Sequence, residues 1–380
     1  MEGKWYLCRL KPSEEYFFGG ERTFDFEGNA GAKKEEKTSY YIRSEKWPNQ
    51  STLLGVLRFL VLKKHGKLSD WNERLEVKDL IGQEGFSLSD STREYGKIKE
   101  ITPVFMMDEL ENRWIRTPIN HKAKKNEEDY NTSYVPMKTQ KNALLTDRGE
   151  VYLPQDYIAK DGLTESIINI GDGVNKSNDI IQYPIMNIEK YPGVPGVLKA
   201  FEKIGIARGL TDDGFFKKQF WQMDKDFSFA FYCRAEQDAF DKSDIVYVGQ
   251  GKSTFQFTSK ELNYDPIEKM SNDIRLINIG EKDLYYALSD LYLEDNSIKG
   301  YSIVKKKYFR SLGQTPVEGQ SQNDKQKSFR NSKKKSKLYE LIEAGSVFFY
   351  DPIINKEKQE GYKQVGLNYI IKVEGSSDEK

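Results

Sequence analysis

A glycine-rich segment, Val248-Gly249-Gln250-Gly251-Lys252-Ser253-Thr254, contains the Gly-Lys-Ser-Thr core of a phosphate-binding loop. Glycine lets backbone N–H groups approach an anion, and lysine, serine and threonine add donors. A complete P-loop also needs glycine where this chain has Val246, and a helix directly afterwards, where it has Phe255-Gln256-Phe257. Nucleotide hydrolysis is therefore not predicted. Two compatible interpretations remain: a contact to one phosphate of an RNA backbone, or a tight turn that needs glycine at positive φ. On the first, the contact residues are Gly249, Gly251, Lys252, Ser253 and Thr254.

Lysine and arginine concentrate between residues 305 and 337, where eleven cations stand against two acidic residues and give a local charge of +9. Such a segment can bind phosphates and release counterions, which makes RNA affinity depend on salt. The alternative is a solvated loop on a protein whose other surfaces are acidic, and composition weighs the two equally. On the first interpretation, the lysines expected at the RNA are Lys305, Lys307, Lys333, Lys334 and Lys335.

The segment Arg43-Ser44-Glu45-Lys46-Trp47-Pro48-Asn49-Gln50-Ser51-Thr52 directly precedes an apolar run. An indole can stack on a base, a guanidinium can pair with phosphate, and amides and hydroxyls can read base edges. Ser51 and Thr52 can instead cap the following helix, and Trp47 can instead pack in a core or an interface. On the RNA interpretation, the contact residues are Arg43, Trp47, Asn49, Gln50 and Ser51.

Side chains that commonly catalyse are scarce. His65 and His121 are the only two histidines, which limits any mechanism that needs imidazole as base, acid or ligand. Cys8 and Cys233 cannot form a disulfide framework or a four-cysteine zinc site, and both lie in strand-like runs where a buried thiol is the simple interpretation. Carboxylates are plentiful but form no acid–base or metal-ligand pattern. We predict no catalytic residues, no metal site and no cofactor.

Composition limits the class of protein. The chain has 380 residues, enough for two domains, because single cores rarely grow beyond roughly 250–300 residues. Hydrophobic residues make up 37%, which excludes a wholly disordered chain, and 59 basic residues balance 59 acidic ones, which excludes a uniformly basic nucleic-acid coat. No apolar run approaches the ~20 residues of a membrane span, and the N-terminus lacks a signal-peptide pattern. We expect a cytoplasmic protein with no membrane partner.

Hydrophobic patterning predicts the elements that would position these side chains. We expect a strand over residues 4–10, and a half-buried strand over residues 227–234, where large apolar residues recur with period two. Residues 53–62 predict a buried helix, which Lys63-Lys64-His65-Gly66 would end. Further strands are expected at residues 245–248, 284–288, 346–350 and 365–373, and helical segments at residues 259–270 and 337–342.

Strands and helices mix in both halves of the chain without the regular alternation of a doubly wound sheet. The pattern predicts an α+β protein with two ferredoxin-like (RRM-like) domains that carry large loop insertions. Prolines and glycines punctuate residues 182–196. We therefore place an N-terminal domain with polar insertions at residues 1–190, and a C-terminal domain with the basic loop 305–337 at residues 191–380.

Six segments stand in order along most of the chain: Phe18-Gly19-Gly20-Glu21-Arg22-Thr23-Phe24, Trp47-Pro48-Asn49-Gln50-Ser51-Thr52-Leu53-Leu54-Gly55-Val56-Leu57-Arg58, Ile204-Gly205-Ile206-Ala207-Arg208 with Gly214-Phe215-Phe216, Tyr247-Val248-Gly249-Gln250-Gly251-Lys252-Ser253-Thr254-Phe255, Ala344-Gly345-Ser346-Val347-Phe348-Phe349-Tyr350 and Gln364-Val365-Gly366-Leu367-Asn368. Together they resemble the repeat-associated (RAMP) superfamily of CRISPR proteins. Their order is most similar to subunit three of type III-B (Cmr) effector complexes. Two departures stand out: the first glycine loop keeps only Arg22 of an arginine-rich pattern, and Asn368 stands where a second glycine is common.

The resemblance implies two ferredoxin-like domains and a non-catalytic subunit of a ribonucleoprotein complex in antiviral defence. Such a subunit grips the repeat-derived 5′ handle of CRISPR RNA. It also bridges the large polymerase/cyclase-type subunit to the backbone-forming RAMP subunits, and meets target RNA only indirectly. The resemblance adds Arg22 to the expected RNA-binding residues. A clamp of this kind needs glycine loops, cations and aromatic rings but no histidine or carboxylate set, which agrees with the residues present.

Three alternatives stay open. The chain could be the equivalent handle-binding subunit of a type III-A or III-D complex. It could be a RAMP-type endoribonuclease that processes precursor CRISPR RNA, with His65 or His121 as general acid or base. It could also be a protein-only scaffold whose aromatic residues form subunit interfaces.

Overall fold

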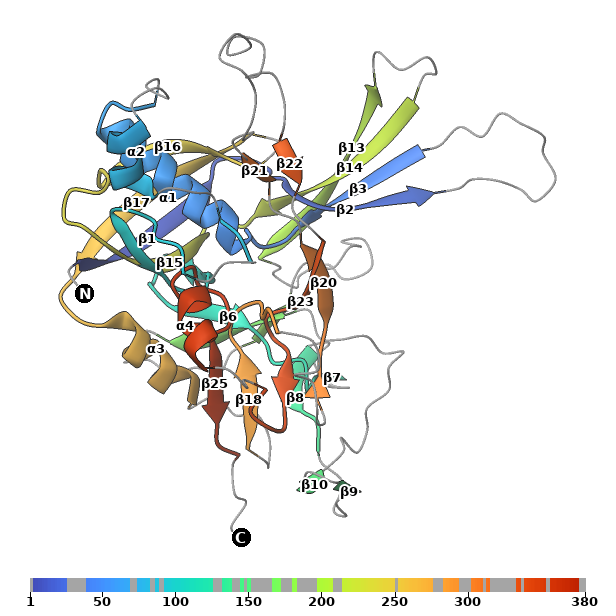
Figure 1. Ribbon diagram of the computed structural model, residues 1–380. Coiled ribbons are helices and arrows are strands. Elements are labelled where there is room, and N and C mark those ends of the chain that lie inside the picture. Colours follow the sequence, from blue (N-terminus) through green and yellow to red (C-terminus); the bar gives the residue numbers. More distant parts are fainter. Residues whose placement is uncertain are drawn as a thin grey trace.

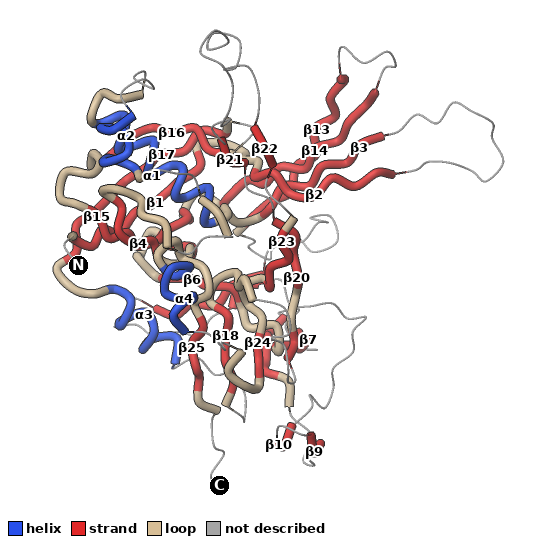
Figure 2. Tube along the Cα trace, in the orientation of Figure 1, coloured by secondary structure: helices blue, strands red, loops and turns tan. Residues whose placement is uncertain are grey.

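The structure is a computed structural model, and most of its elements are strands, with four helices among the residues it describes (Figures 1 and 2). The expected α+β class is confirmed. None of the described helices combines the length and the apolar character of a membrane span. The described residues are 3–25, 39–68, 74–82, 86–88, 92–125, 132–138, 144–146, 149–151, 166–171, 180–182, 197–207, 214–249, 252–275, 283–293, 302–309, 312–314, 333–335, 338–352 and 356–375.

The largest sheet, which we call the main sheet, is organised around β1 (Lys4–Pro12). This strand pairs antiparallel with β15 (Phe227–Ala235) on one side and with β17 (Ser253–Leu262) on the other. β15 pairs in turn with β4 (Ile98–Ile101), and α1 (Gln50–Lys64) lies in the chain between β1 and β4. In chain order, the four strands of this unit are β1, β4, β15 and β17. In the sheet, the first of them lies between the third and the fourth, as in a ferredoxin-like split βαβ unit.

The main sheet extends beyond this unit in both directions. β15 also pairs with β5 (Phe105–Asp108), and the order continues through β6, β11 and β12 to one edge. At the opposite edge β17 pairs with β16. The bounds of these strands are Arg113–Arg116 for β6, Ser166–Gly171 for β11, Ile180–Gln182 for β12 and Ser243–Val248 for β16.

A second lobe repeats the same strand order in a smaller antiparallel sheet. Its β18 lies between β25 and β24, and β24 pairs with β19, so the first strand again lies between the third and the fourth. Helix α3 precedes this sheet and α4 lies between its last two strands. The bounds are Pro266–Arg275 for α3, Leu284–Ala287 for β18, Ser302–Ile303 for β19, Val347–Phe348 for β24, Lys356–Lys363 for α4 and Ile370–Val373 for β25.

Two ferredoxin-like units are therefore present, but the division expected at residue 190 is corrected. β1 hydrogen-bonds to β15 and β17, which lie beyond residue 226, so a cut at residues 190/191 would divide the main sheet. The first lobe runs through β17, and the second begins with α3. Composition could not locate this boundary because strand pairing between distant segments decides the division. The prolines and glycines expected to mark it, within residues 182–196, lie outside the described residues.

The main sheet is covered on both faces. One apolar cluster joins α1 to one face through Leu53, Leu57, Phe229 and Phe231. A second cluster joins the opposite face to α3 and the second sheet, through residues such as Tyr232, Met270 and Tyr286. The expectation that residues 227–234 form a half-buried strand is wrong for this reason: both faces of β15 are buried, since Ser228, Ala230 and Tyr232 face the second lobe.

A separate four-stranded sheet, which we call the arm sheet, projects from the two lobes (Figure 1). Its order is β13-β14-β3-β2, and β3 pairs parallel with β14 while the other pairs are antiparallel. The bounds are Phe18–Asp25 for β2, Ser39–Glu45 for β3, Leu198–Ala207 for β13 and Gly214–Met223 for β14.

The remaining elements are short. α2 packs beside α1, and four two-stranded ribbons complete the described structure. The helix expected at residues 337–342 is instead β23, because pairing with β20 buries its Tyr339, Leu341 and Ile342. Residues 259–270 are the end of β17 and the start of α3. The bounds are Arg74–Ile81 for α2, His121–Lys125 and Thr132–Pro136 for β7 and β8, Leu144–Thr146 and Gly149–Val151 for β9 and β10, Lys306–Phe309 and Tyr339–Ile342 for β20 and β23, and Leu312–Gln314 and Lys333–Lys335 for β21 and β22.

Candidate nucleic-acid interface

The glycine-rich segment forms the turn of the β16–β17 hairpin. Gly249 and Lys252 have φ of 76° and 52°, and Val248 pairs with Ser253 across the turn. A Cβ on Gly249 would lie 2.4 Å from the carbonyl oxygen of Phe17, so only glycine fits. The turn leads into a strand and not into a helix, which agrees with the absence of a P-loop. The interpretation as a tight turn is confirmed.

Within this turn the side chains have different positions. The Ser253 hydroxyl is buried and accepts a 3.0 Å hydrogen bond from the backbone N–H of Phe17, so it fixes the loop between β1 and β2. The Thr254 carbonyl likewise accepts from the N–H of Ser13 at 3.0 Å. Lys252 is exposed, and Gly251 lies outside the described residues. Lys252 is therefore the side chain of this segment that is placed to meet a phosphate.

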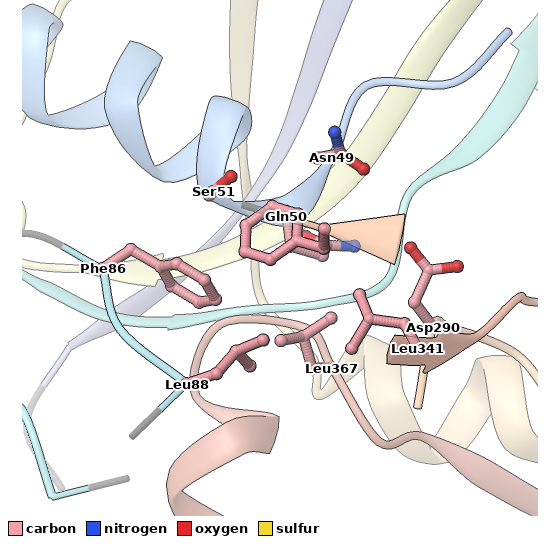
Figure 3. Close-up of a pocket in the computed structure, with 9 residues that line it drawn as sticks. Asn49, Gln50, Ser51, Phe86, Leu88, Asp290, Leu341 and Leu367 are labelled. Carbon is pink, nitrogen blue, oxygen red and sulfur yellow. The ribbon is translucent and has the colours of Figure 1, made fainter. Parts of the chain in front are cut away.

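The start of α1 faces the second lobe (Figure 3). The helix begins at Gln50 with Asn49 as N-cap, so neither Ser51 nor Thr52 caps it, and the Asn49 side chain makes no capping bond. Asn49 Oδ1 instead accepts a 3.0 Å hydrogen bond from Lys307 Nζ. With its amide oriented to suit its neighbours, Gln50 donates to the Val365 carbonyl at 3.2 Å and accepts from the N–H of Val104 at 3.1 Å.

Asn49, Gln50 and Ser51 line a small hollow between the lobes. Its volume is about 10 Å³, close to what one water molecule needs, so it cannot take a base. Asn49, Gln50 and Ser51 are therefore positioned as contacts between the lobes in this structure. The lining comprises Asn49, Gln50, Ser51, Phe86, Leu88, Asp290, Phe309, Leu341 and Leu367.

Trp47, expected to stack on a base, is a core residue. Its side chain is only 5% exposed. The ring centroid lies 5.9 Å from that of Phe229, and the Arg116 guanidinium lies 5.2 Å from the ring centroid. Trp47 therefore packs in the core, as the alternative interpretation predicted, and it is not placed to stack on a base.

Lys305 and Lys307, expected at the RNA, belong to an ion-pair network between the lobes. Lys307 pairs with the buried Asp290, and Lys305 Nζ lies 3.3 Å from a Glu343 carboxylate that also pairs with Arg116 at 2.7 Å. Burial disfavours the charge on Asp290, but Lys307 and Arg116 outweigh it and hold the pKa of Asp290 below its usual value. Burial likewise disfavours the charge on Glu343, but Arg116 and Lys305 outweigh it and lower the pKa of Glu343. Lys307 is mostly buried and neutralises an internal carboxylate, so it is not placed at an RNA surface. Lys305 is still 44% exposed, and its expected contact to RNA stays a prediction.

Four other expected residues lie on described strands. Arg22 is in β2 of the arm sheet, where its backbone pairs with that of Ile42. Lys333, Lys334 and Lys335 form β22, which pairs antiparallel with β21. The strands described within the basic segment thus belong to two ribbons, β20–β23 and β21–β22.

The structure shows why asparagine suits position 368 in the segment Gln364-Val365-Gly366-Leu367-Asn368. Gly366 and Asn368 both have positive φ, at 78° and 58°, and asparagine is a non-glycine residue that tolerates this region. Asn368 is fully buried, and its amide bonds the backbone of Tyr292 twice, at 2.7 Å and 3.0 Å. A second glycine would keep the backbone conformation but lose both bonds.

The arm sheet carries a face that the sequence analysis did not identify. Strand register places Lys199, Phe201 and Lys203 of β13 on the same face as Lys218 and Phe220 of β14. Lys199 Nζ lies 4.9 Å from the Phe201 ring centroid, and Lys203 Nζ lies 4.9 Å from that of Phe220. Phe17 adjoins these rings, 5.4 Å from Phe220, with Lys218 Nζ 5.5 Å from its centroid. We call these six residues the cation–aromatic face.

The opposite face of the arm sheet is more balanced in charge. Glu202 lies there and bonds Tyr41 at 3.0 Å and Lys217 at 2.8 Å, and these two hydrogen bonds lower its pKa. Arg43 is exposed on this face, with its guanidinium 5.3 Å from the centroid of Tyr41. On the cation–aromatic face, the acidic side chain near the described lysines is Glu15, which pairs with Lys203.

The cation–aromatic face can bind a single nucleic-acid strand, because cations track phosphates and aromatic rings support bases. A signal for it exists in the sequence: Lys199, Phe201 and Lys203 alternate with period two. It was missed because the two strands are separated by residues 208–213 and become one face only through their register.

The two histidines are not arranged as a catalytic pair. His121 is buried, and its Nδ1 lies 3.0 Å from the Pro118 carbonyl and 3.1 Å from Asn120 Oδ1. His65 is the C-cap of α1. In the part of the chain that the structure describes, no three histidine, cysteine or carboxylate side chains are grouped to hold a metal ion.

Comparison with known proteins gives a limited result. No family model matches the chain, and no curated protein matches it. Among solved structures, the chain is similar to a chain of the Csm3-Csm4 subcomplex in the type III-A CRISPR-Cas interference complex. The identity is 11%, the match covers 91% of this chain and 92% of that chain, and the TM-score is 0.37.

Proposed function

We propose that this chain is a non-catalytic RAMP subunit that binds CRISPR RNA in a type III effector complex. Its role is that of subunit three of the type III-B complex: gripping the repeat-derived 5′ handle, and bridging the large polymerase/cyclase-type subunit to the backbone-forming RAMP subunits. The ordered motifs named above support the family, and the two ferredoxin-like units agree with it.

The observation that carries RNA binding is the cation–aromatic face. Lys199, Lys203 and Lys218 lie on one face of a projecting sheet, next to the half-buried rings of Phe201 and Phe220. Single-strand binding proteins combine cations along the backbone with rings under the bases, and this combination tolerates many sequences. Lys252 adds a cation on a separate turn.

The decisive experiment measures RNA affinity against salt concentration. The probe is a fluorescent single-stranded RNA with the repeat-derived 5′ handle of the host's own CRISPR array. For the variant with Lys199→Gln, Lys203→Gln and Lys218→Gln, we expect the slope of log affinity against log salt to flatten by about 2, since each lost single-strand phosphate contact removes about 0.7.

The matched control removes three surface lysines from the lobes, with Lys4→Gln, Lys260→Gln and Lys372→Gln. Each of these lysines makes an exposed ion pair, so the change in net charge and the cost in stability are similar. An equal change of slope in both variants would contradict the proposed interface. Cleavage of the probe by the unmodified protein would contradict the non-catalytic role.

A further inference from the structure

In the part of the chain that the structure describes, no strand pairs with the outer edge of β16, and this edge lacks the residues that usually protect a strand edge. β16 pairs with β17 on one side and ends the order of the main sheet on the other (Figure 1). Natural edges are commonly blunted by lysine, proline or a bulge, but Ser243-Asp244-Ile245-Val246-Tyr247-Val248 contains neither residue, and its pairing with β17 is regular. Its one charge, Asp244, is paired with Lys63 at 2.6 Å.

The backbone groups of this edge point away from β17. The N–H of Ile245 donates to the Asp244 carboxylate at 2.7 Å, so it is directed outward. In an antiparallel strand, residues two apart point the same way, which directs the N–H and C=O of Tyr247 outward as well. Asp244 thus occupies the place that a carbonyl of an added strand would take.

A groove runs beside this edge, between β16 and the exposed side of α1. Its volume is about 180 Å³, and apolar cavities of roughly 150 Å³ can hold a benzene ring. Gly55 leaves open space where a side chain would be, because a Cβ there would meet no atom within 4 Å. The lining comprises Thr52, Gly55, Val56, Phe59, Val246, Tyr247, Val248 and Gly249.

The other face of β16 is also apolar and open. Ile245 is 61% exposed and Tyr247 is 68% exposed. A strand added at this edge would place alternate side chains in the groove and the others beside Ile245 and Tyr247. The occupant therefore needs apolar side chains on both faces, which means an uninterrupted apolar run.

A second copy of this chain does not meet this requirement through its own β16. Val246 and Val248, the β16 side chains on the groove side, are only 1% and 2% exposed because α1 covers them. Self-pairing would leave both grooves unfilled and would bring two α1 helices together.

We propose that the β16 edge docks an extended apolar segment of a different protein chain by strand addition. Lys252 is exposed at one end of the edge, and no ion pair to it is present in the described structure. This position favours an acidic residue at the corresponding end of the apolar run. In the assembled complex this acidic residue would take the place of a phosphate at Lys252. The proposed RNA binding rests on the cation–aromatic face of the arm sheet, so the docking proposal goes beyond RNA binding and does not depend on it.

The first test maps the contact in the complex purified with its natural partners. A benzophenone amino acid replaces Tyr247, and the products of irradiation are identified by mass spectrometry. We expect a crosslink to a continuous apolar segment of another polypeptide, flanked by an acidic residue. Crosslinks to RNA, to a second copy of this chain or to no partner would overturn the proposal.

The second test uses two variants that retain the fold. Tyr247→Pro removes an outward N–H without breaking a bond to β17, and Tyr247→Val keeps that N–H as the control. Gly55→Leu fills the groove and replaces a helix-interior glycine with a good helix former. We expect retention of the subunit in the complex to fall about tenfold for Tyr247→Pro and for Gly55→Leu, and to stay within about threefold for Tyr247→Val.

The thermal stability and RNA affinity of each isolated variant are measured in parallel. We expect RNA affinity to be unchanged, so a complex that lacks RNA but retains the crosslink would contradict the proposed function and leave this inference intact. Normal retention of both Tyr247→Pro and Gly55→Leu would overturn the strand-addition site.

Discussion

At the scale of single residues, Ser253 joins the turn of the β16–β17 hairpin to the loop after β1. Its hydroxyl is the acceptor for the buried N–H of Phe17. Ser253→Ala would leave that N–H without a partner, which costs about 1–3 kcal/mol. We expect a lower midpoint of urea denaturation with unchanged slope. Ser243→Ala, on the exposed start of β16, is the control and should be neutral. Equal midpoints for the two variants would contradict this role.

Two glycines should respond in opposite directions to the same change. Gly249→Ala places a methyl group 2.4 Å from the Phe17 carbonyl oxygen at a φ of 76°, so the turn must distort and the protein should lose stability. Gly55→Ala adds a methyl group in open space within α1 and should stabilise the protein by about 0.5–1 kcal/mol. Melting temperatures of the two variants measure this contrast. A stabilised Gly249→Ala would show that the turn does not have the described conformation.

At the scale of elements, variants of the arm sheet distinguish the contribution of the aromatic rings to RNA affinity from that of the lysine charges. We expect the double variant Phe201→Ala and Phe220→Ala to weaken single-stranded RNA binding by about 1–3 kcal/mol for each base that stacks, with an unchanged salt slope. The lysine variant should instead change the slope. Affinities measured at several salt concentrations distinguish the two. A ring variant that changes the slope would mean that the aromatic residues only hold the lysines in place.

The elements also show what sequence reasoning can and cannot predict. β15 was predictable because its large apolar residues recur with period two. α1 was predictable because a long apolar run is followed by lysine, histidine and glycine, which commonly end a helix. β23 was predicted as a helix because residues such as Glu340 and Leu341 favour helices locally, while pairing with β20 determines the strand. The cation–aromatic face depends on the register between β13 and β14, which local patterns do not encode.

At the scale of the whole molecule, the buried ion pairs of the second lobe, one of which reaches Arg116 of the first, make stability depend on pH. The pKa values of Asp290 and Glu343 are lowered in the folded state, so their stabilisation is present above their unfolded pKa values and is lost as pH falls from about 5 toward 3. Lys307→Met would leave Asp290 buried without its ammonium partner, which costs about 3–5 kcal/mol near neutral pH. We expect this cost to shrink as the solution becomes acidic and Asp290 is protonated.

The measurement is the free energy of unfolding of both proteins from pH 3 to pH 7. Lys306→Met is the control, because the neighbouring Lys306 makes an exposed pair with Glu340 whose removal should cost about 0–1 kcal/mol. A Lys307→Met penalty that is constant across this range would show that Asp290 is not ionised in the folded protein.

For the candidate site, the sequence predicted which side-chain chemistry is present better than it predicted where those side chains lie in the fold. Lys307 and Trp47 have the right chemistry for RNA, but the structure uses Lys307 to neutralise the buried Asp290 and Trp47 to fill the core beside Phe229. Buried carboxylates such as Asp290 attract cations, as phosphates do. The sequence alone does not show which residues are in contact, so it cannot show which anion a lysine pairs with.

The position of β1 also determines when this protein can fold during its synthesis. The strand leaves the ribosome long before both of its neighbours in the sheet, β15 and β17, which begin only at Phe227 and Ser253. At translation rates of about 5–20 residues per second, β1 remains without a native neighbour for roughly 10–45 s. The apolar residues of the nascent chain are exposed throughout that interval, so production of this protein should depend on chaperones more than its size alone would require.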